Sequence, residues 1–171
     1  MSDPRAEVLR WARSQIGTTD PAAYFADAAP AFTSMRGISW CQIGALWCLR
    51  QAGLTDWTHA IGGGWLSRLP VTRTPLPGDI EYLANSKAGH PVQHGCVFAG
   101  VTADGALVSI DFNVAGGTVA EKVRRAEWYS PRPVFYSIQR LVDAKLAADA
   151  EVKALEKHDT DPCLPPFPVE P

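Results

Sequence analysis

One cysteine and one histidine in this chain have the residue types and the spacing that nucleophilic catalysis needs. Cys41 lies at the start of the segment 40–51, which has the composition of a helix, so we expect this thiol at a helix N-terminus. Unpaired backbone N–H groups and the positive end of the helix dipole favour a thiolate there, and the thiolate is the nucleophilic form of cysteine. His94 opens a later segment with strand periodicity and is the candidate general base for that thiol.

Asp111 and Asn113 are the candidates for the group that orients His94. Two predicted strands flank the turn sequence at 103–105, which indicates a β-hairpin. If the turn is centred on its first two residues, Asn113 lies opposite His94 and Asp111 opposite Cys96. If the turn is centred on its last two residues, Asn113 lies opposite Cys96. Because strand side chains alternate between faces, both registers put Asp111 and Asn113 on the face of His94, within cross-strand reach.

The remaining cysteines and histidines have simpler interpretations. Cys48 lies two turns inside the predicted helix and is expected in the core, while Cys96, in the middle of a strand, is expected to pack. His90 precedes a proline in a predicted loop and is the less favoured alternative to His94 as base. His90, His94 and Cys96 have no second pair of ligands with matching spacing, so no metal site is predicted.

The elements that must position these residues form an α+β pattern, with helices first and a sheet second. Asp3 and Pro4 are typical of a helix start, and one face of that helix carries Val8, Leu9, Ala12 and Ile16. The range 18–38 is predicted to be loop, and the nucleophile helix is predicted at 40–51. From residue 78 the hydrophobic period becomes two, which predicts about five antiparallel strands at 79–83, 94–101, 106–113, 118–124 and 133–138.

Two parts of the chain are expected: a domain at 1–140, and a C-terminal helix with a proline-rich tail at 141–171. The composition, with 46% hydrophobic and 20% charged residues and a net charge of -2, gives no reason to expect a nucleic acid partner or membrane insertion. The N-terminus lacks the basic and apolar regions of a signal peptide, so synthesis in the cytoplasm without general secretory export is expected. Oligomeric state is not predicted.

Four segments together resemble the CHAP family of cysteine, histidine-dependent amidohydrolases/peptidases, which are papain-like relatives of the NlpC-type peptidases. The segments are the nucleophile helix with its Ser-Trp-Cys start, the Leu-Pro-Gly-Asp-Ile turn at 76–80, the histidine strand at 94–101 and the acid-x-Asn strand at 109–113. The resemblance implies a papain-like fold, with Cys41 as nucleophile, His94 as base, and Asp111 and Asn113 in the site.

The chain also departs from the family pattern. Asp111 stands where the family commonly has Glu, Phe112 where a small residue is usual, and Met35 where papain-like enzymes have an oxyanion Gln. Some relatives bind calcium through closely spaced acids before the cysteine. Asp20 and Asp27 are too sparse for such a site, so no metal and no cofactor are expected.

The resemblance implies hydrolysis of an amide bond in bacterial peptidoglycan, by an endopeptidase or an N-acetylmuramoyl-L-alanine amidase such as a bacteriophage endolysin. An endolysin made in the host cytoplasm would reach the cell wall after release through a membrane lesion, and an injected effector would also fit. Two alternatives stay open. One is a catalytically silent binding or virion-structural module with the same fold, and the other is a cysteine peptidase that acts on protein.

Overall fold

The computed structural model describes most of the 171-residue chain. His90, Cys163, Met35 and the proline-rich part of the tail lie outside the described residues, so the expectations placed on them have no structural counterpart here. The described ranges are 3–33, 39–59, 64–85, 91–114, 116–129 and 132–160.

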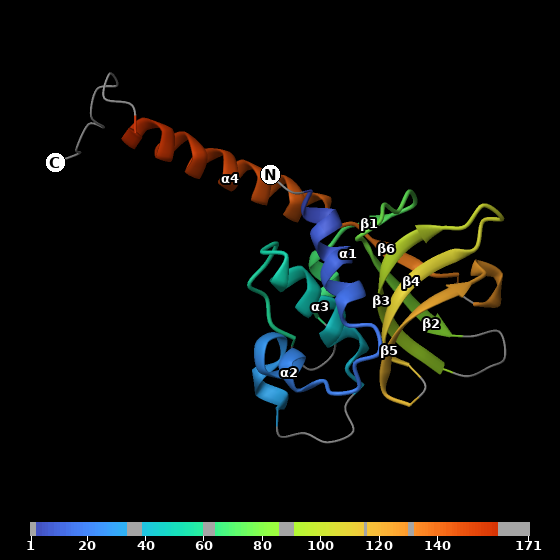
Figure 1. Ribbon diagram of the computed structural model, residues 1–171. Coiled ribbons are helices and arrows are strands. Elements are labelled where there is room, and N and C mark those ends of the chain that lie inside the picture. Colours follow the sequence, from blue (N-terminus) through green and yellow to red (C-terminus); the bar gives the residue numbers. More distant parts are fainter. Residues whose placement is uncertain are drawn as a thin grey trace.

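Helices cover one face of an antiparallel sheet, and a long helix extends away from the body (Figure 1). The helix α3 packs on β3 and β4, and α1 and α2 pack against α3. The α+β class is therefore confirmed, with a sheet of six strands in the order β1-β6-β2-β3-β4-β5. The helices are α1 (Pro4–Ser14), α2 (Ala22–Ala28), α3 (Cys41–Gln51) and α4 (Gln139–Thr160). The strands are β1 (Val71–Thr72), β2 (Ile80–Asn85), β3 (Pro91–Val101), β4 (Leu107–Val114), β5 (Thr118–Arg124) and β6 (Val134–Tyr136).

Several elements differ from the sequence-based expectation. The helix α2 lies inside the range predicted to be loop. It is only seven residues long, and packing of its apolar residues against α3 stabilises it. The strand β1 is new, and its two residues pair with β6. Ile16 was expected on the buried face of the first helix but is 47% exposed, because α1 ends at Ser14 and the helical period ends with it.

The β3–β4 hairpin has a pairing that neither predicted turn produces by itself. Its loop has three residues, 103–105, with Gly105 at φ +80°, the left-handed conformation that closes such loops. This loop shifts the register by one residue, and a bulge beside Gly100 shifts it back. As a result Cys96 lies opposite Asp111, as expected for the first of the two registers.

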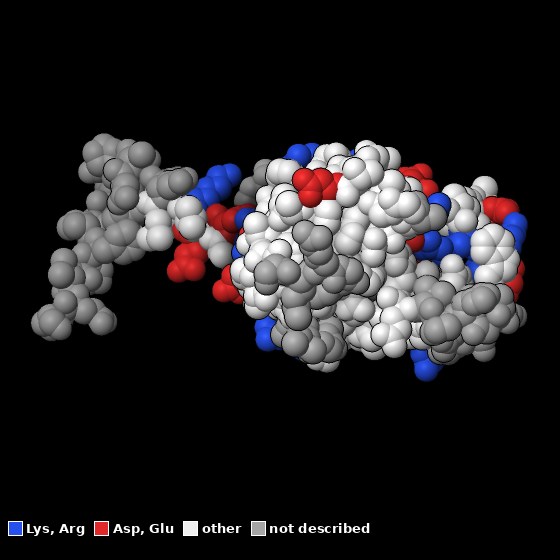
Figure 2. Space-filling model, turned by 90° about the horizontal axis from the view of Figure 1, so that it is seen from below, with Lys and Arg blue, Asp and Glu red and all other residues white. Residues whose placement is uncertain are grey.

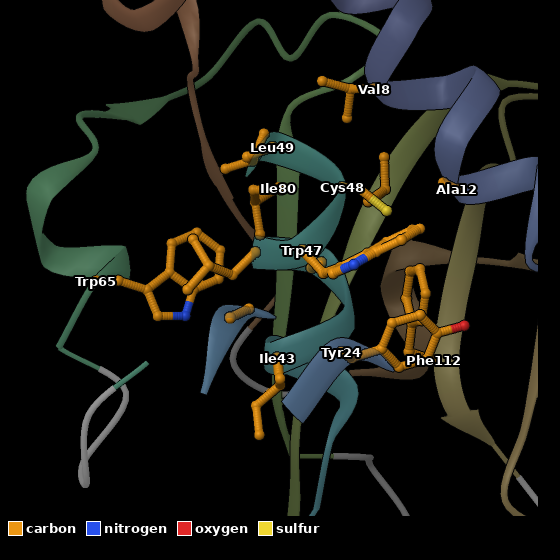
Figure 3. Close-up of a cluster of buried hydrophobic side chains, with 14 of the residues drawn as sticks. Val8, Ala12, Tyr24, Ile43, Trp47, Cys48, Leu49, Trp65, Ile80 and Phe112 are labelled. Atoms are coloured by element: carbon orange, nitrogen blue, oxygen red, sulfur yellow. The ribbon is translucent and has the colours of Figure 1, made fainter. Parts of the chain in front are cut away.

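Close approach of α3 to this hairpin depends on two glycines. A Cβ atom on Gly44 would lie 2.2 Å from the ring of Phe112, and one on Gly95 would lie 2.9 Å from the side chain of Gln42. Phe112 is fully buried and makes an edge contact with Tyr24, with ring centroids 5.5 Å apart. Figure 3 shows these two rings together with Trp47 of α3. The position of Phe112, unusual for the family that the sequence resembles, is thus matched by a glycine on the helix.

Asp79, expected to shape a turn, joins three parts of the fold. Its buried carboxylate accepts hydrogen bonds from the backbone N–H groups of Leu76 at 2.8 Å and Ile138 at 2.9 Å. The Arg5 guanidinium of α1 donates to it at 2.8 Å. The start of β2, the first helix and the segment entering α4 are therefore tied at one point.

The surface carries both signs of charge. On the face seen in Figure 2, acidic and basic side chains lie in small scattered groups among residues of other types. Within the described ranges, every helix is too short or too polar to cross a lipid bilayer.

We expect Gly44→Ala to destabilise the fold, because the added methyl group collides with the Phe112 ring. The free energy of unfolding, measured by urea denaturation, should fall by about 3 kcal/mol. Phe112→Ala should cost about 3–5 kcal/mol, and the double variant less than the sum, since the methyl then occupies space left by the ring. Gly64→Ala, whose Cβ meets nothing within 4 Å, is the control. Full additivity would contradict the contact.

Candidate functional site

Cys41 is the first residue of α3, as the sequence predicts. The residue is only 2% exposed, and its Sγ lies 3.4 Å from Ser39 Oγ and 3.8 Å from the backbone oxygen of Gln93 on β3. No side chain among the described residues caps this helix start. The thiol therefore lies between the positive end of α3 and the backbone of the histidine strand.

The two partners of His94 are the carboxylate of Asp111 and the thiol of Cys41. Its Nε2 lies 2.9 Å from Asp111 Oδ2, and its ring is near enough to the Cys41 thiol for each group to shift the pKa of the other. The His94 side chain is 14% exposed and the Asp111 side chain 2%. The structure thus brings together three of the four site residues that were predicted from the sequence, in the order Cys41, His94, Asp111.

The electrostatics of this arrangement favour a thiolate and an imidazolium. Burial would raise the pKa of the Cys41 thiol, but its interactions with His94, Ser39 and the backbone of Gly95 lower that pKa from 9.0 to about 7. Burial would likewise lower the pKa of His94, but Asp111 and Cys41 raise it from 6.5 to about 9. Between these two values the favoured state is the ion pair, with the proton on the ring.

Asp111 is held as a carboxylate despite its burial. Burial alone would raise its pKa, but His94 and the guanidinium of Arg124 lower it from 3.8 to about 2. Ser109 donates a further hydrogen bond to Asp111 Oδ1 at 2.8 Å. A negative charge facing His94 is therefore present at every pH at which the thiolate can form.

Sequence reasoning missed the buried charges behind Asp111. Arg124 of β5 is 7% exposed and pairs with Asp111, and Glu81 of β2 is fully buried with its Oε2 4.0 Å from Arg124 Nη1. Alternating polar residues in a strand usually indicate a solvent-facing side, so the sequence pattern alone does not mark Arg124 and Glu81 as buried. The buried group becomes recognisable once the strands are paired. Glu81 then lies beside Cys96, and Cys96 lies beside Asp111.

Among the described residues the hydrogen-bond partner of His94 is Asp111 and that of the Asn113 side chain is Ser39, so the backbone at Asn113 departs from the expected strand alternation. The β4–β5 register shifts between Asp111 and Val114, and Asn113 has φ +59°, in the left-handed region. This conformation turns the side chain out of the strand alternation. Its Nδ2 instead donates to Ser39 Oγ at 3.4 Å, so Asn113 reaches Cys41 only through Ser39.

The other two described cysteines are buried in different surroundings. Cys48 lies in the apolar core, as expected, and burial raises its pKa. Cys96 is also buried, but among charges rather than in apolar packing, with Sγ 3.7 Å from Glu81 Oε2. Ligand atoms of His94, Cys96 and Asp111 lie within 4.8 Å of one another. Arg124 donates hydrogen bonds to two of these residues, and its positive charge disfavours a metal cation there.

We expect alkylation of Cys41 by iodoacetamide to follow a titration with its midpoint near pH 7, because His94 lowers the thiol pKa to that value. In His94→Ala the burial remains and the lowering interaction is lost, so the midpoint should move above 9.0. Peptide mapping by mass spectrometry identifies the labelled cysteine. A midpoint at the ordinary thiol value in the parent protein would contradict the ion pair.

The same titration separates the roles of Asp111 and Asn113. Asp111→Asn removes the negative charge that raises the pKa of His94, so the Cys41 midpoint should rise by about one pH unit. Asn113→Ala should move it much less, because Asn113 contacts only Ser39 within this group. Circular dichroism confirms that the compared variants are folded. A larger shift for Asn113→Ala would make Asn113 the residue that orients His94.

No family model, curated protein or solved structure matches this chain. What the site can do therefore follows from its own geometry. A thiol of lowered pKa at a helix N-terminus, next to a histidine held by a buried carboxylate, has the groups needed to attack a carbonyl carbon and to protonate the leaving group.

Proposed function

We propose that the protein is a cysteine hydrolase of amide bonds with a papain-like fold of the CHAP type. The observation that carries this proposal is the placement of Cys41 at the start of α3 beside His94, which Asp111 holds at 2.9 Å. Nucleophile, base and orienting acid follow one another in the chain in the order of the family that the sequence resembles. The nucleophile helix also packs on the strands that carry the other two residues.

The reaction proceeds in two halves. The Cys41 thiolate attacks the carbonyl carbon, and backbone N–H groups at the start of α3 stabilise the oxyanion that forms. His94 then gives its proton to the departing amine, leaving a thioester on Cys41. In the second half, neutral His94 takes a proton from water, the hydroxide attacks the thioester, and the carboxylic acid leaves. The proton on His94 and the Cys41 thiolate are thereby restored.

Two departures from the family pattern are compatible with this chemistry. Asp111 is shorter than the usual Glu, yet its carboxylate reaches His94 at hydrogen-bond distance. Phe112 is larger than the usual residue, yet Gly44 leaves space for its ring. A silent module would have no need for a buried carboxylate that raises the histidine pKa or for a thiol pKa lowered to about 7.

The proposed substrate is bacterial peptidoglycan, and the bond is an amide of the stem peptide or the bond between N-acetylmuramic acid and L-alanine. The support for this choice is the resemblance of four sequence segments to the CHAP family. A bacteriophage endolysin, released onto the wall after synthesis in the host cytoplasm, is the role that this substrate suggests. The site geometry itself supports only the reaction class.

We expect the protein to clear suspensions of purified sacculi, and Cys41→Ala to be inactive because the nucleophile is absent. Turnover should fall by at least about a thousandfold in Cys41→Ala. Cys48→Ala, which removes a buried thiol of the same helix outside the site, is the matched control and should keep most of the activity. Turbidity gives the rate, and mass spectrometry of the released fragments identifies the bond.

Sacculi of several peptidoglycan types are needed, since the host is not specified by the sequence. If folded protein with a reactive Cys41 clears none of them, the wall substrate is wrong and a protein substrate becomes the better proposal. If Cys41 also lacks its low-pH reactivity, the catalytically silent module is the better interpretation.

A further inference from the structure

The guanidinium of Arg124 donates hydrogen bonds to Asp111, Ser109 and Cys96 beside the candidate site. It is the last residue of β5, and its guanidinium donates to both carboxylate oxygens of Asp111, from Nη1 to Oδ1 at 3.2 Å and from Nη2 to Oδ2. Nη1 also donates to Ser109 Oγ at 2.6 Å, and Ser109 donates in turn to Asp111 Oδ1. The carboxylate is thus held on both oxygens, and Oδ2 faces His94.

The groups around Asp111 come from β2, β3, β4 and β5 and from the segment that follows β5. Glu81 of β2 is the nearest other acid to Arg124, but burial raises its pKa to about 7, so it is largely protonated below neutrality. Arg124 is therefore the permanently charged partner of Asp111, whereas His94 gains and loses its proton. The neighbours that face the pair are His94 and Cys96 of β3, Glu81 of β2, Ser109 of β4 and Tyr129 after η3 (Ala126–Trp128).

An arginine suits this task better than a lysine. Its planar fork binds two oxygens at once and fixes the plane of the carboxylate, whereas an ammonium group supplies only a point charge. Without the fork, rotation about the Asp111 side chain would move Oδ2 away from His94. The largest influences on the pKa of Cys41 are burial, His94, Ser39 and the backbone of Gly95. Arg124 donates to Asp111, and Asp111 faces His94, so we expect Arg124 to act on the thiol through these two residues.

We propose that Arg124 is a positioning residue of the site, which locks the Asp111 carboxylate toward His94 and thereby maintains the charged pair of His94 and Cys41. This role rests on the cysteine hydrolase proposed above. It assigns a function to the last residue of β5 and joins that strand to the chemistry, although β5 carries no group that reaches the thiol.

The test is the pH dependence of Cys41 alkylation by iodoacetamide, which requires no substrate. In Arg124→Met the midpoint should rise by about one pH unit, so that the rate at pH 6 falls about tenfold. Arg124→Lys, which keeps the charge but loses the fork, should give a smaller shift. Arg50→Met is the matched control, because Arg50 also pairs with an aspartate, Asp27 at 2.8 Å, but at the far end of α3.

A double-variant cycle distinguishes positioning from simple structural support. If Arg124 acts through Asp111, adding Arg124→Met to Asp111→Asn should leave the alkylation midpoint of Asp111→Asn unchanged. A second shift of equal size would overturn the proposal, as would an unshifted midpoint in Arg124→Met. Should Arg124→Met not fold, since it leaves a buried carboxylate without its partner, Arg124→Lys and the double variant provide the same comparison.

The outcomes also separate this role from the proposed function. If the parent protein has no reactive thiol near pH 7, the cysteine hydrolase itself is wrong. If the parent has that thiol, and the Arg124 variants keep its midpoint, only the role of Arg124 is wrong. On any substrate that is cleaved, the role predicts a lower kcat per alkylatable Cys41 in Arg124→Met, with KM little changed.

Discussion

The contact between α3 and the β3–β4 hairpin is the constraint on which the rest of the structure depends. The helix start must come close enough to β3 for Cys41 to lie against the backbone of Gln93. Two positions without side chains, Gly44 on the helix and Gly95 on the strand, make this approach possible. A packing requirement therefore determines the distance between nucleophile and base, and the buried apolar cluster around this contact provides the free energy that holds it.

On the other face of the same strands, the fold must bury charged side chains. A buried carboxylate is costly unless it is paired and hydrogen-bonded, and Asp111 has His94 on one side and Arg124 on the other. Together with Cys41 these groups alternate in sign, from thiolate to imidazolium to carboxylate to guanidinium. Each charge lowers the cost of burying its neighbour, which explains how His94, mostly buried, keeps a pKa of about 9 and Cys41 one of about 7.

The sequence predicted the features that depend on neighbouring residues, and it did not predict those that depend on the pairing of distant strands. Helix periodicity and the segment after Trp40 placed Cys41 at a helix start, and strand alternation placed Asp111 on the face of His94. Arg124 and Glu81 were not found, because polar residues at alternate strand positions are indistinguishable from a solvated face until the other strands are placed. Asn113 was misplaced because strand alternation was continued through it, although Asn is one of the residues that most often adopt a positive φ and the register shifts there.

Strand register links the two faces to each other. In β4 the apolar side chain of Phe112 supports the nucleophile helix, and the adjacent carboxylate of Asp111 holds the histidine, so one strand serves both needs by simple alternation. A slip of one residue would put the carboxylate under α3 and the ring among the charges, which would disrupt packing and chemistry together. The bulge at Gly100 compensates for the three-residue loop and prevents that slip. Although it lies at the opposite end of the hairpin from His94, this bulge therefore belongs to the structural basis of the site.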